Sequence, residues 1–142
     1  MYRPYESDLT EQILGASPVE LTQLLYAEAR RAISRACVCT RMQDPAGRSQ
    51  AVSRAMDIVT ELNSSLDLAR GGDLSQRLRT IYTWVLEQLA SGHVSQSESL
   101  LRGAEEVLAV LEQAWDGVRH DRVGLTEAPA GNAPVQSFSF AA

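Results

Sequence analysis

The residues best suited to chemistry in this chain of 142 residues are its two cysteines and two histidines. Cys37 and Cys39 are two positions apart in a stretch predicted to be helical, where that separation turns the side chains about 200° apart around the axis. They therefore cannot bridge each other, and two thiols alone do not make a zinc site. We interpret both cysteines as small residues of the core or its boundary.

The histidines do not complete a catalytic or cofactor site. A carboxylate-bridged di-iron centre needs glutamate three residues before each histidine, but Ala90 precedes His93 and Gly117 precedes His120 at that spacing. The chain has no C-x-x-C-H haem motif, no G-x-S-x-G nucleophile motif and no glycine-rich phosphate loop. We interpret both histidines as surface residues and predict no catalytic residue, no metal site, no cofactor and no enzymatic activity.

Composition narrows the possible partners. The net charge is −5 and the sequence pI is about 5.0, whereas binding to a phosphate backbone needs a basic surface. Arginines gather between positions 30 and 54, and we interpret them as a solvated face. No apolar run has the length of a signal peptide core or a membrane span. These features predict a cytoplasmic protein that binds no nucleic acid.

The elements that would position any site are four helices, expected at about 18–40, 46–70, 74–90 and 95–118. Ser17, Pro18 and Glu20 form a helix-start signal, and Ser95 with Glu98 forms a second capping box. Gly71-Gly72 is expected to end the second helix, Asp73 to cap the third and Gly92 to end it.

Apolar residues within these helices repeat at spacings of three and four, which is the pattern of helix-bundle seams. The second-helix seam is Val52, Ala55, Val59, Leu62, Leu66 and Ala69, and the fourth ends at Trp115 and Val118. Short connections favour antiparallel neighbours. The predicted fold is therefore all-α, an up-down-up-down four-helix bundle over 17–120. Residues 1–16 are expected to form an N-terminal cap segment and residues 121–142 a disordered tail.

The first helix carries more apolar residues than one seam requires. One stripe is Leu21, Leu25, Ala29, Ala32 and Ala36, and a neighbouring stripe is Val19, Tyr26, Ile33 and Cys37. A broad core-facing arc explains such residues one by one. Together with off-seam residues of the other helices, they suggest a groove that a partner segment covers.

Four short motifs, in order, resemble the flagellar secretion chaperone FliS family over roughly residues 5–118. They are Ala16–Leu21 followed by Leu24–Tyr26, then Ala55–Leu62 leading to Ser65–Asp67, then Gly71-Gly72 with Leu78 and Ile81-Tyr82, and finally Leu111 with Ala114-Trp115. The connection at 90–95 and the arginine-rich first helix depart from the family pattern, which leaves the contact residues open.

The resemblance implies a chaperone that binds the disordered C-terminal segment of flagellin in the cytosol, blocks premature polymerisation and delivers the subunit to the type III export gate. It also implies that residues 1–16 act as a displaceable cap. A flagellar regulator is a further candidate partner. The alternative is a non-catalytic adaptor of the flagellar system that dimerises or captures a regulator.

We expect the partner to contact apolar residues of the cap and of three helices. In the cap these are Tyr5, Leu9 and Ile13. On the helices they are Leu21, Leu24, Tyr26, Ile33, Ile58, Tyr82 and Leu86.

Overall fold

The computed structural model describes residues 18–124, which form four helices and, within that range, no strand. The helices are α2 (Pro18–Arg41), α3 (Pro45–Ser64), α4 (Leu68–Val94) and α5 (Glu98–Gly124). The predicted all-α four-helix bundle is confirmed. The cap segment 1–16 and residues 125–142 lie outside the described residues, and α5 continues past position 118, where we expected the fourth helix to end.

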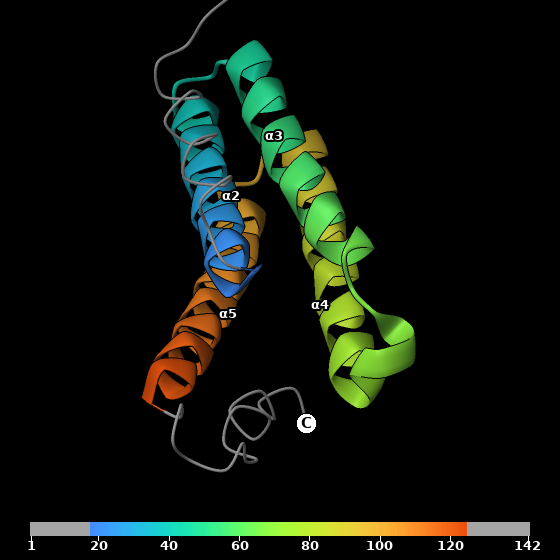
Figure 1. Cartoon of the computed structure of the whole chain (residues 1–142). Coiled ribbons are helices and arrows are strands. Elements are labelled where there is room, and N and C mark those ends of the chain that lie inside the picture. The colour runs from blue at the N-terminus through green and yellow to red at the C-terminus, as the bar shows by residue number, and fades with distance from the viewer. Residues whose placement is uncertain (1–17, 125–142) are drawn as a thin grey trace, which may run out of the picture.

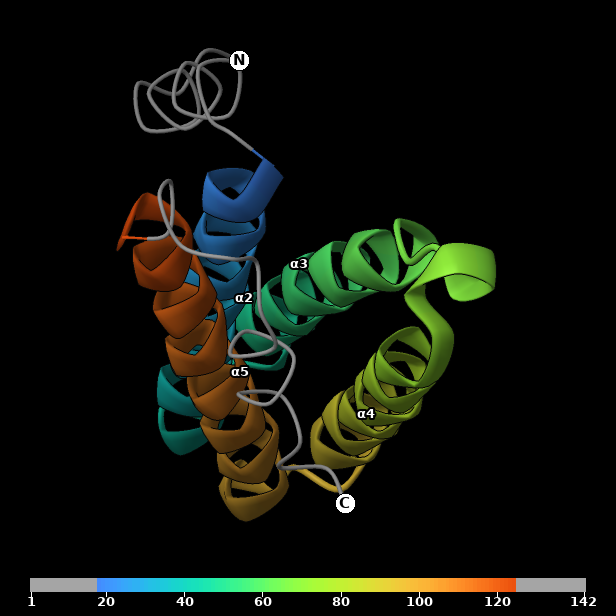
Figure 2. The same cartoon turned by 60° about the horizontal axis from the view of Figure 1, so that its bottom comes forward.

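The helices are arranged as a ring in which α2 packs against α3 and α5, and α4 packs against the same two helices. In Figure 1 the chain rises along α2, descends α3, rises along α4 and descends α5. Figures 1 and 2 both show that α4 and α5 are close at the connection between them and diverge toward the start of α4 and the end of α5. We name these two regions of the bundle the closed end and the open end.

Side-chain size explains why the helices converge at the closed end. In the α2–α3 pair, the C-terminal half of α2 and the first three turns of α3 bury mainly small residues, namely Ala32, Ala36, Cys37, Ala51 and Ala55. In the α4–α5 pair, Gly92 lies so near Leu101 that an added Cβ would be 2.8 Å from its Cδ2 atom. Small residues allow backbones to approach, whereas the buried Tyr26 and Tyr82 hold the helices farther apart.

The second helix is shorter than we predicted. It ends at Ser64, because the hydroxyls of Ser64 and Ser65 bond back to the carbonyls of Thr60 and Leu62. Asp67 then caps α4 by accepting from the Arg70 backbone N–H at 3.0 Å. The predicted stop at Gly71-Gly72 falls inside α4, where Gly72 has φ +55° and ψ −135° and a kink separates the first turn from the rest of the helix. Leu66 is consequently in a connection, and Ala69 is exposed.

The prediction that Gly92 ends the third helix is wrong. The helix continues through it to Val94, and Gly92 is buried in the contact with α5. Ser95 is the C-terminal cap of α4 rather than the start of the next helix. It is the Ser97 hydroxyl that accepts from the Leu100 backbone N–H at 3.2 Å and thereby caps α5.

The core contains most of the predicted seams and also the second stripe of the first helix. Tyr26, Ile33 and Cys37 have no exposed area. The extra stripe is buried because α2 packs against two neighbours on different sides, α3 and α5, and so needs a broad apolar arc. The second stripe of α2 is therefore core, and the accessible large apolar residues near the start of this helix are the half-buried Leu21, Leu24 and Leu25.

Candidate partner-binding surface

The open end exposes part of a set of large apolar side chains. They are half-buried residues of α2, of the α3–α4 connection and of α4: Leu21, Leu24, Leu25, Leu66, Leu74 and Ile81. Several of them pack on the core with one side and leave the other accessible. Because the helices diverge here, no further helix among the described residues covers this surface.

An aromatic network of Tyr26, Tyr82 and Trp115 joins α2, α4 and α5 beneath this surface. The two tyrosine hydroxyls are hydrogen-bonded at 2.5 Å, and the Trp115 indole N–H donates to the Tyr26 hydroxyl at 2.8 Å. Burial raises the pKa of Tyr82 to about 12, and burial together with the neighbouring Tyr82 raises the pKa of Tyr26 further. Both hydroxyls are therefore neutral, and the network is a buried tie between three helices.

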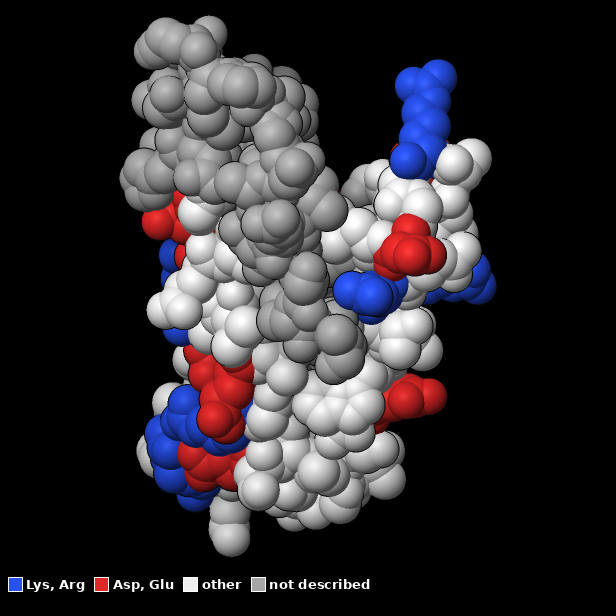
Figure 3. Space-filling view, turned by 90° about the horizontal axis from the view of Figure 1, so that it is seen from below, with Lys and Arg blue, Asp and Glu red and all other residues white. Residues whose placement is uncertain are grey.

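Four large apolar side chains of α4 and α5 are exposed: Leu68 and Val94 at the two ends of α4, and Trp84 and Val110 away from the helix ends. Trp84 is 39% exposed and Val110 is 52% exposed. Trp84 also borders a shallow depression along α4 that Arg79, Thr83 and Glu87 line. Exposed tryptophan is uncommon on a monomer and is enriched at binding hot spots. Seen from below, uncharged residues fill the middle of the lower half of Figure 3, with charged residues mainly to the left of them.

The predicted partner-contact residues fall into three groups. Leu21, Leu24 and Leu86 are half-buried and accessible. Tyr5, Leu9 and Ile13 lie outside the described residues. The remaining four are in the core, with at most 5% of their area exposed: Tyr26, Ile33, Ile58 and Tyr82. A side chain with no exposed area contacts a partner only if the helices separate, so we do not propose these four as direct contacts.

Sequence reasoning missed Trp84 and Val110. Neither belongs to a seam, and a single apolar residue on an outer face is usually unremarkable. The signal that was available is their spacing: Trp84 is three residues after Ile81, and Val110 is three residues after Val107. Residues three apart in a helix lie on neighbouring positions of its surface, so Trp84 and Val110 are each next to a half-buried residue and farther from the core.

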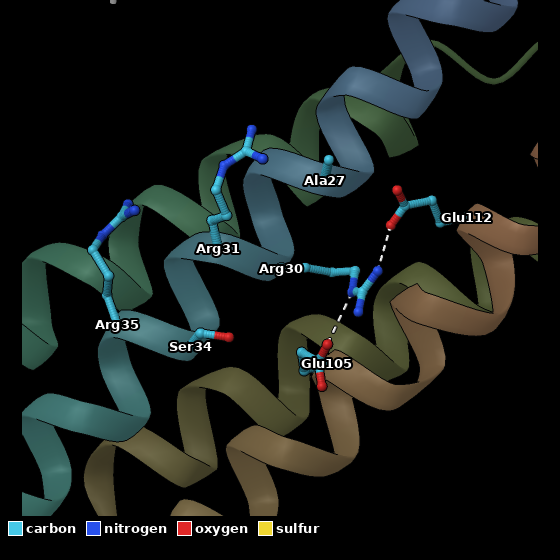
Figure 4. Close-up of a pocket in the computed structure, with 7 residues that line it drawn as sticks. All are labelled: Ala27, Arg30, Arg31, Ser34, Arg35, Glu105 and Glu112. Atoms are coloured by element: carbon cyan, nitrogen blue, oxygen red, sulfur yellow. Dashed lines mark hydrogen bonds and ion pairs between the residues drawn. The ribbon is translucent and has the colours of Figure 1, made fainter. Parts of the chain in front are cut away.

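Between α2 and α5 lies a charged groove, drawn in Figure 4. Arg30 reaches across it and donates to Glu105 at 2.9 Å and to Glu112 at 2.7 Å. These carboxylates, Glu112 first, raise the pKa of Arg30. Its charge is therefore neutralised within the chain, which argues that this groove ties two helices together and is not a vacant anion site.

We interpreted the arginines between positions 30 and 54 as a solvated face, but several of them make specific contacts with other residues. Arg48 is buried and donates from Nε to His93 Nδ1 at 3.0 Å, so His93 joins α3 to α4 near the closed end. Glu28 is 1% exposed and pairs with Arg31 at 3.0 Å and with Arg54 at 3.7 Å. A buried carboxylate needs such partners, and the pair with Arg54 links α2 to α3.

No metal-ligand cluster of three or more histidine, cysteine, aspartate or glutamate residues occurs within the described part of the chain. Cys37 is fully buried, and burial raises the pKa of its thiol, which disfavours the reactive thiolate. The described helices contain none that is long and apolar enough to cross a membrane. The arrangement offers apolar contact surface rather than a set of reacting groups.

The fold and surface define the class of protein as a helical bundle with an open, apolar end. Within that class the sequence matches the family model described as Flagellar protein FliS over residues 1–122. The chain therefore belongs to the FliS family.

Curated relatives agree with the family model. The chain is 24% identical over 120 residues to the flagellar secretion chaperone FliS of Vibrio cholerae, covering 84% of this chain and 88% of the relative. It is 27% identical over 109 residues to the flagellar secretion chaperone FliSB of Pseudomonas aeruginosa, covering 77% and 86%. It is 30% identical over 105 residues to the FliS of Campylobacter jejuni, covering 74% and 82%.

Proposed function

We propose that this protein is a cytoplasmic, non-catalytic chaperone that binds the C-terminal segment of flagellin, prevents its premature polymerisation and delivers it to the type III export apparatus. The homologues, named flagellar secretion chaperones, support a flagellar export chaperone. The observation that carries the finer proposal is the accessible apolar surface at the open end, around Leu21, Leu24 and Ile81.

The binding energy would come from burial of apolar area. A segment that is disordered on its own loses conformational entropy when it binds, so it needs a large apolar surface in compensation. The partly covered leucines of α2 and α4 offer such area without helix separation. Residues of the cap segment, Tyr5, Leu9 and Ile13, would cover the same surface until a client displaces them.

The test is a calorimetric titration with a synthetic peptide of the C-terminal segment of flagellin from the same organism. Leu24→Asp is expected to weaken binding by about tenfold or more, because full burial of a leucine contributes about 1.5–3 kcal/mol. The matched control is Val94→Asp, which changes an exposed apolar residue at the closed end and should leave the affinity unchanged.

Failure has two recognisable forms. No binding at tens of micromolar peptide would reject flagellin as the client. If light scattering then shows a tight dimer of the wild-type chain, the adaptor alternative is favoured. Equal losses in Leu24→Asp and Val94→Asp would reject the open end as the binding surface while keeping the client.

A further inference from the structure

The face that combines α4 and α5 is an outward apolar feature that shares Ile81 with the surface proposed for the client and extends beyond it along both helices. We name it the α4–α5 face and define it by Ile81, Trp84, Val107, Val110 and Ala114. None of these five side chains is charged, and each is half-buried or exposed. Ile81 and Val107 also pack against the core, which fixes the position of this face on the bundle.

Helical periodicity places these residues along one seam. Gly92 lies against Leu100, since a Cβ on the glycine would be 3.3 Å from the Cβ of that leucine. Ile81 is three turns before Gly92 on α4, and Val107 is two turns after Leu100 on α5, so both look onto the α4–α5 side. Trp84 and Val110 lie one turn from them, at the outer border.

Residues 125–142 follow directly from α5, the helix that carries three of these five residues. Their sequence, LTEAPAGNAPVQSFSFAA, has one charged residue, Glu127, and two phenylalanines. Aromatic side chains on an almost uncharged segment can bury apolar area against the uncharged α4–α5 face without burying a charge. The α2–α5 groove is lined by charged residues and provides less apolar area for such a segment.

The lengths also agree. Phe138 is as many residues after Gly124 as Val110 is before it. A helix advances about 1.5 Å per residue, while an extended chain spans about 3.3 Å per residue. A segment that turns back directly after Gly124 therefore covers that distance with less than half of its maximum reach.

From these observations we propose that residues 125–142, within the tail that composition predicts to be disordered, fold back on the α4–α5 face, with Phe138 and Phe140 as the anchoring side chains, and occupy it until a client displaces them. Because the segment is tethered, its effective concentration is of millimolar order, so even a weak contact is populated. The displacement step rests on the proposed function, but the docking step does not.

The docking step is tested on the full chain by the two tryptophan indole N–H signals in a ¹⁵N NMR spectrum, assigned with Trp84→Phe. The double variant Phe138→Ser/Phe140→Ser should move the Trp84 signal and leave the Trp115 signal in place. The matched control Ser137→Ala/Ser139→Ala keeps both phenylalanines and should leave the Trp84 signal unmoved. An unchanged Trp84 signal in the phenylalanine variant would overturn the docking.

Two further measurements distinguish docking of residues 125–142 from other ways in which the α4–α5 face could be covered. In a Cys39→Ser background, Val110→Cys and Ser139→Cys, which keep both phenylalanines, should form an intramolecular disulfide faster than Val94→Cys and Ser139→Cys, because Val94 is at the closed end. Equal rates would contradict a preferred position. A Trp84 signal that moves with protein concentration, together with a dimer by light scattering, would assign the face to a second copy and overturn the proposal.

The displacement step is tested with the flagellin peptide. A segment docked nine-tenths of the time weakens apparent binding about tenfold, so Phe138→Ser/Phe140→Ser should tighten binding by about that factor. Equal affinities of this variant and the wild type would overturn displacement. If no chain binds the peptide, the proposed function fails, and the NMR result still decides the docking.

Discussion

The closed and open ends of the bundle are built from different residues. At the closed end, alanines and Gly92 bring backbones together, and the large apolar residues exposed there, Val38, Met42 and Val94, do not belong to the core cluster. At the open end, Tyr26, Tyr82 and Trp115 bridge a wider gap through hydroxyl and indole hydrogen bonds. The comparison teaches that stability and binding surface are separated along one set of helices, and each variant below tests that separation.

The largest effect is expected from a charge placed in the shared core. Ile33→Asp should cost more than about 4 kcal/mol and unfold the bundle, because Ile33 has no exposed area and the carboxylate would be buried without a partner. Circular dichroism under urea measures this loss. Leu24→Asp, at the half-exposed open end, should stay helical, and unfolding of that variant would show that the open end is core.

A glycine pair tests the closed end. Gly92→Ala should destabilise the protein by about 1–3 kcal/mol, since the added Cβ would be 2.8 Å from the fully buried Leu101. Gly103→Ala, on α5 with nothing within 4 Å of the new Cβ, should instead stabilise by about 0.5–1 kcal/mol through helix propensity. If the urea midpoints of both variants shift from the wild-type value in the same direction, close packing at Gly92 is contradicted.

Alkaline pH tests the aromatic network. The folded protein holds the hydroxyl protons of Tyr26 and Tyr82 more tightly than the unfolded chain, so their contribution is complete below about pH 10 and is lost as the pH rises toward 12. The expected loss is about 1.4 kcal/mol per hydroxyl by pH 11. Urea unfolding from pH 8 to 11 measures it, and Tyr26→Phe should reduce the slope. A flat profile in the wild type would argue against burial of these hydroxyls.

The smallest effect is expected at the surface of the closed end. Arg41 pairs with Glu98 at 2.6 Å, but about half of the arginine side chain is exposed. Arg41→Gln should therefore cost less than about 0.5 kcal/mol, and high salt should remove the difference. A loss above about 1 kcal/mol in urea unfolding would mean that this ion pair is as important as the packing near it.

The sequence predicted the fold because periodic seams and capping signals agree along most of the chain. Val59, Val85 and Leu108 each belong to a set of apolar residues that repeats at helical spacing in its own helix, and all three are buried. Glycines were the main source of error, since Gly92 serves close helix packing and not a helix end. The sequence alone does not show whether a glycine ends a helix or allows close packing of two helices. At Gly92 the contact with Leu101 in the structure shows that it allows close packing.

The candidate surface was harder to predict than the fold. Periodicity identifies which side of a helix is apolar, but the number of neighbours decides whether that side is covered. Tyr26 and Ile33 are buried because α5 covers the side of α2 that α3 leaves free. Trp84 is exposed because the described part of the chain places no helix outside α4.

The small residues at the closed end also bear on the order in which the chain folds. The helices α2 and α3 are adjacent in sequence, and a three-residue connection joins them, whereas the α2–α5 contact closes a much longer loop. Local contacts form before distant ones, and alanine loses little side-chain entropy when it packs. We therefore expect the α2–α3 hairpin to form the folding nucleus. Ala55→Gly should then slow refolding more than Ala104→Gly does, in stopped-flow kinetics normalised to each variant's stability.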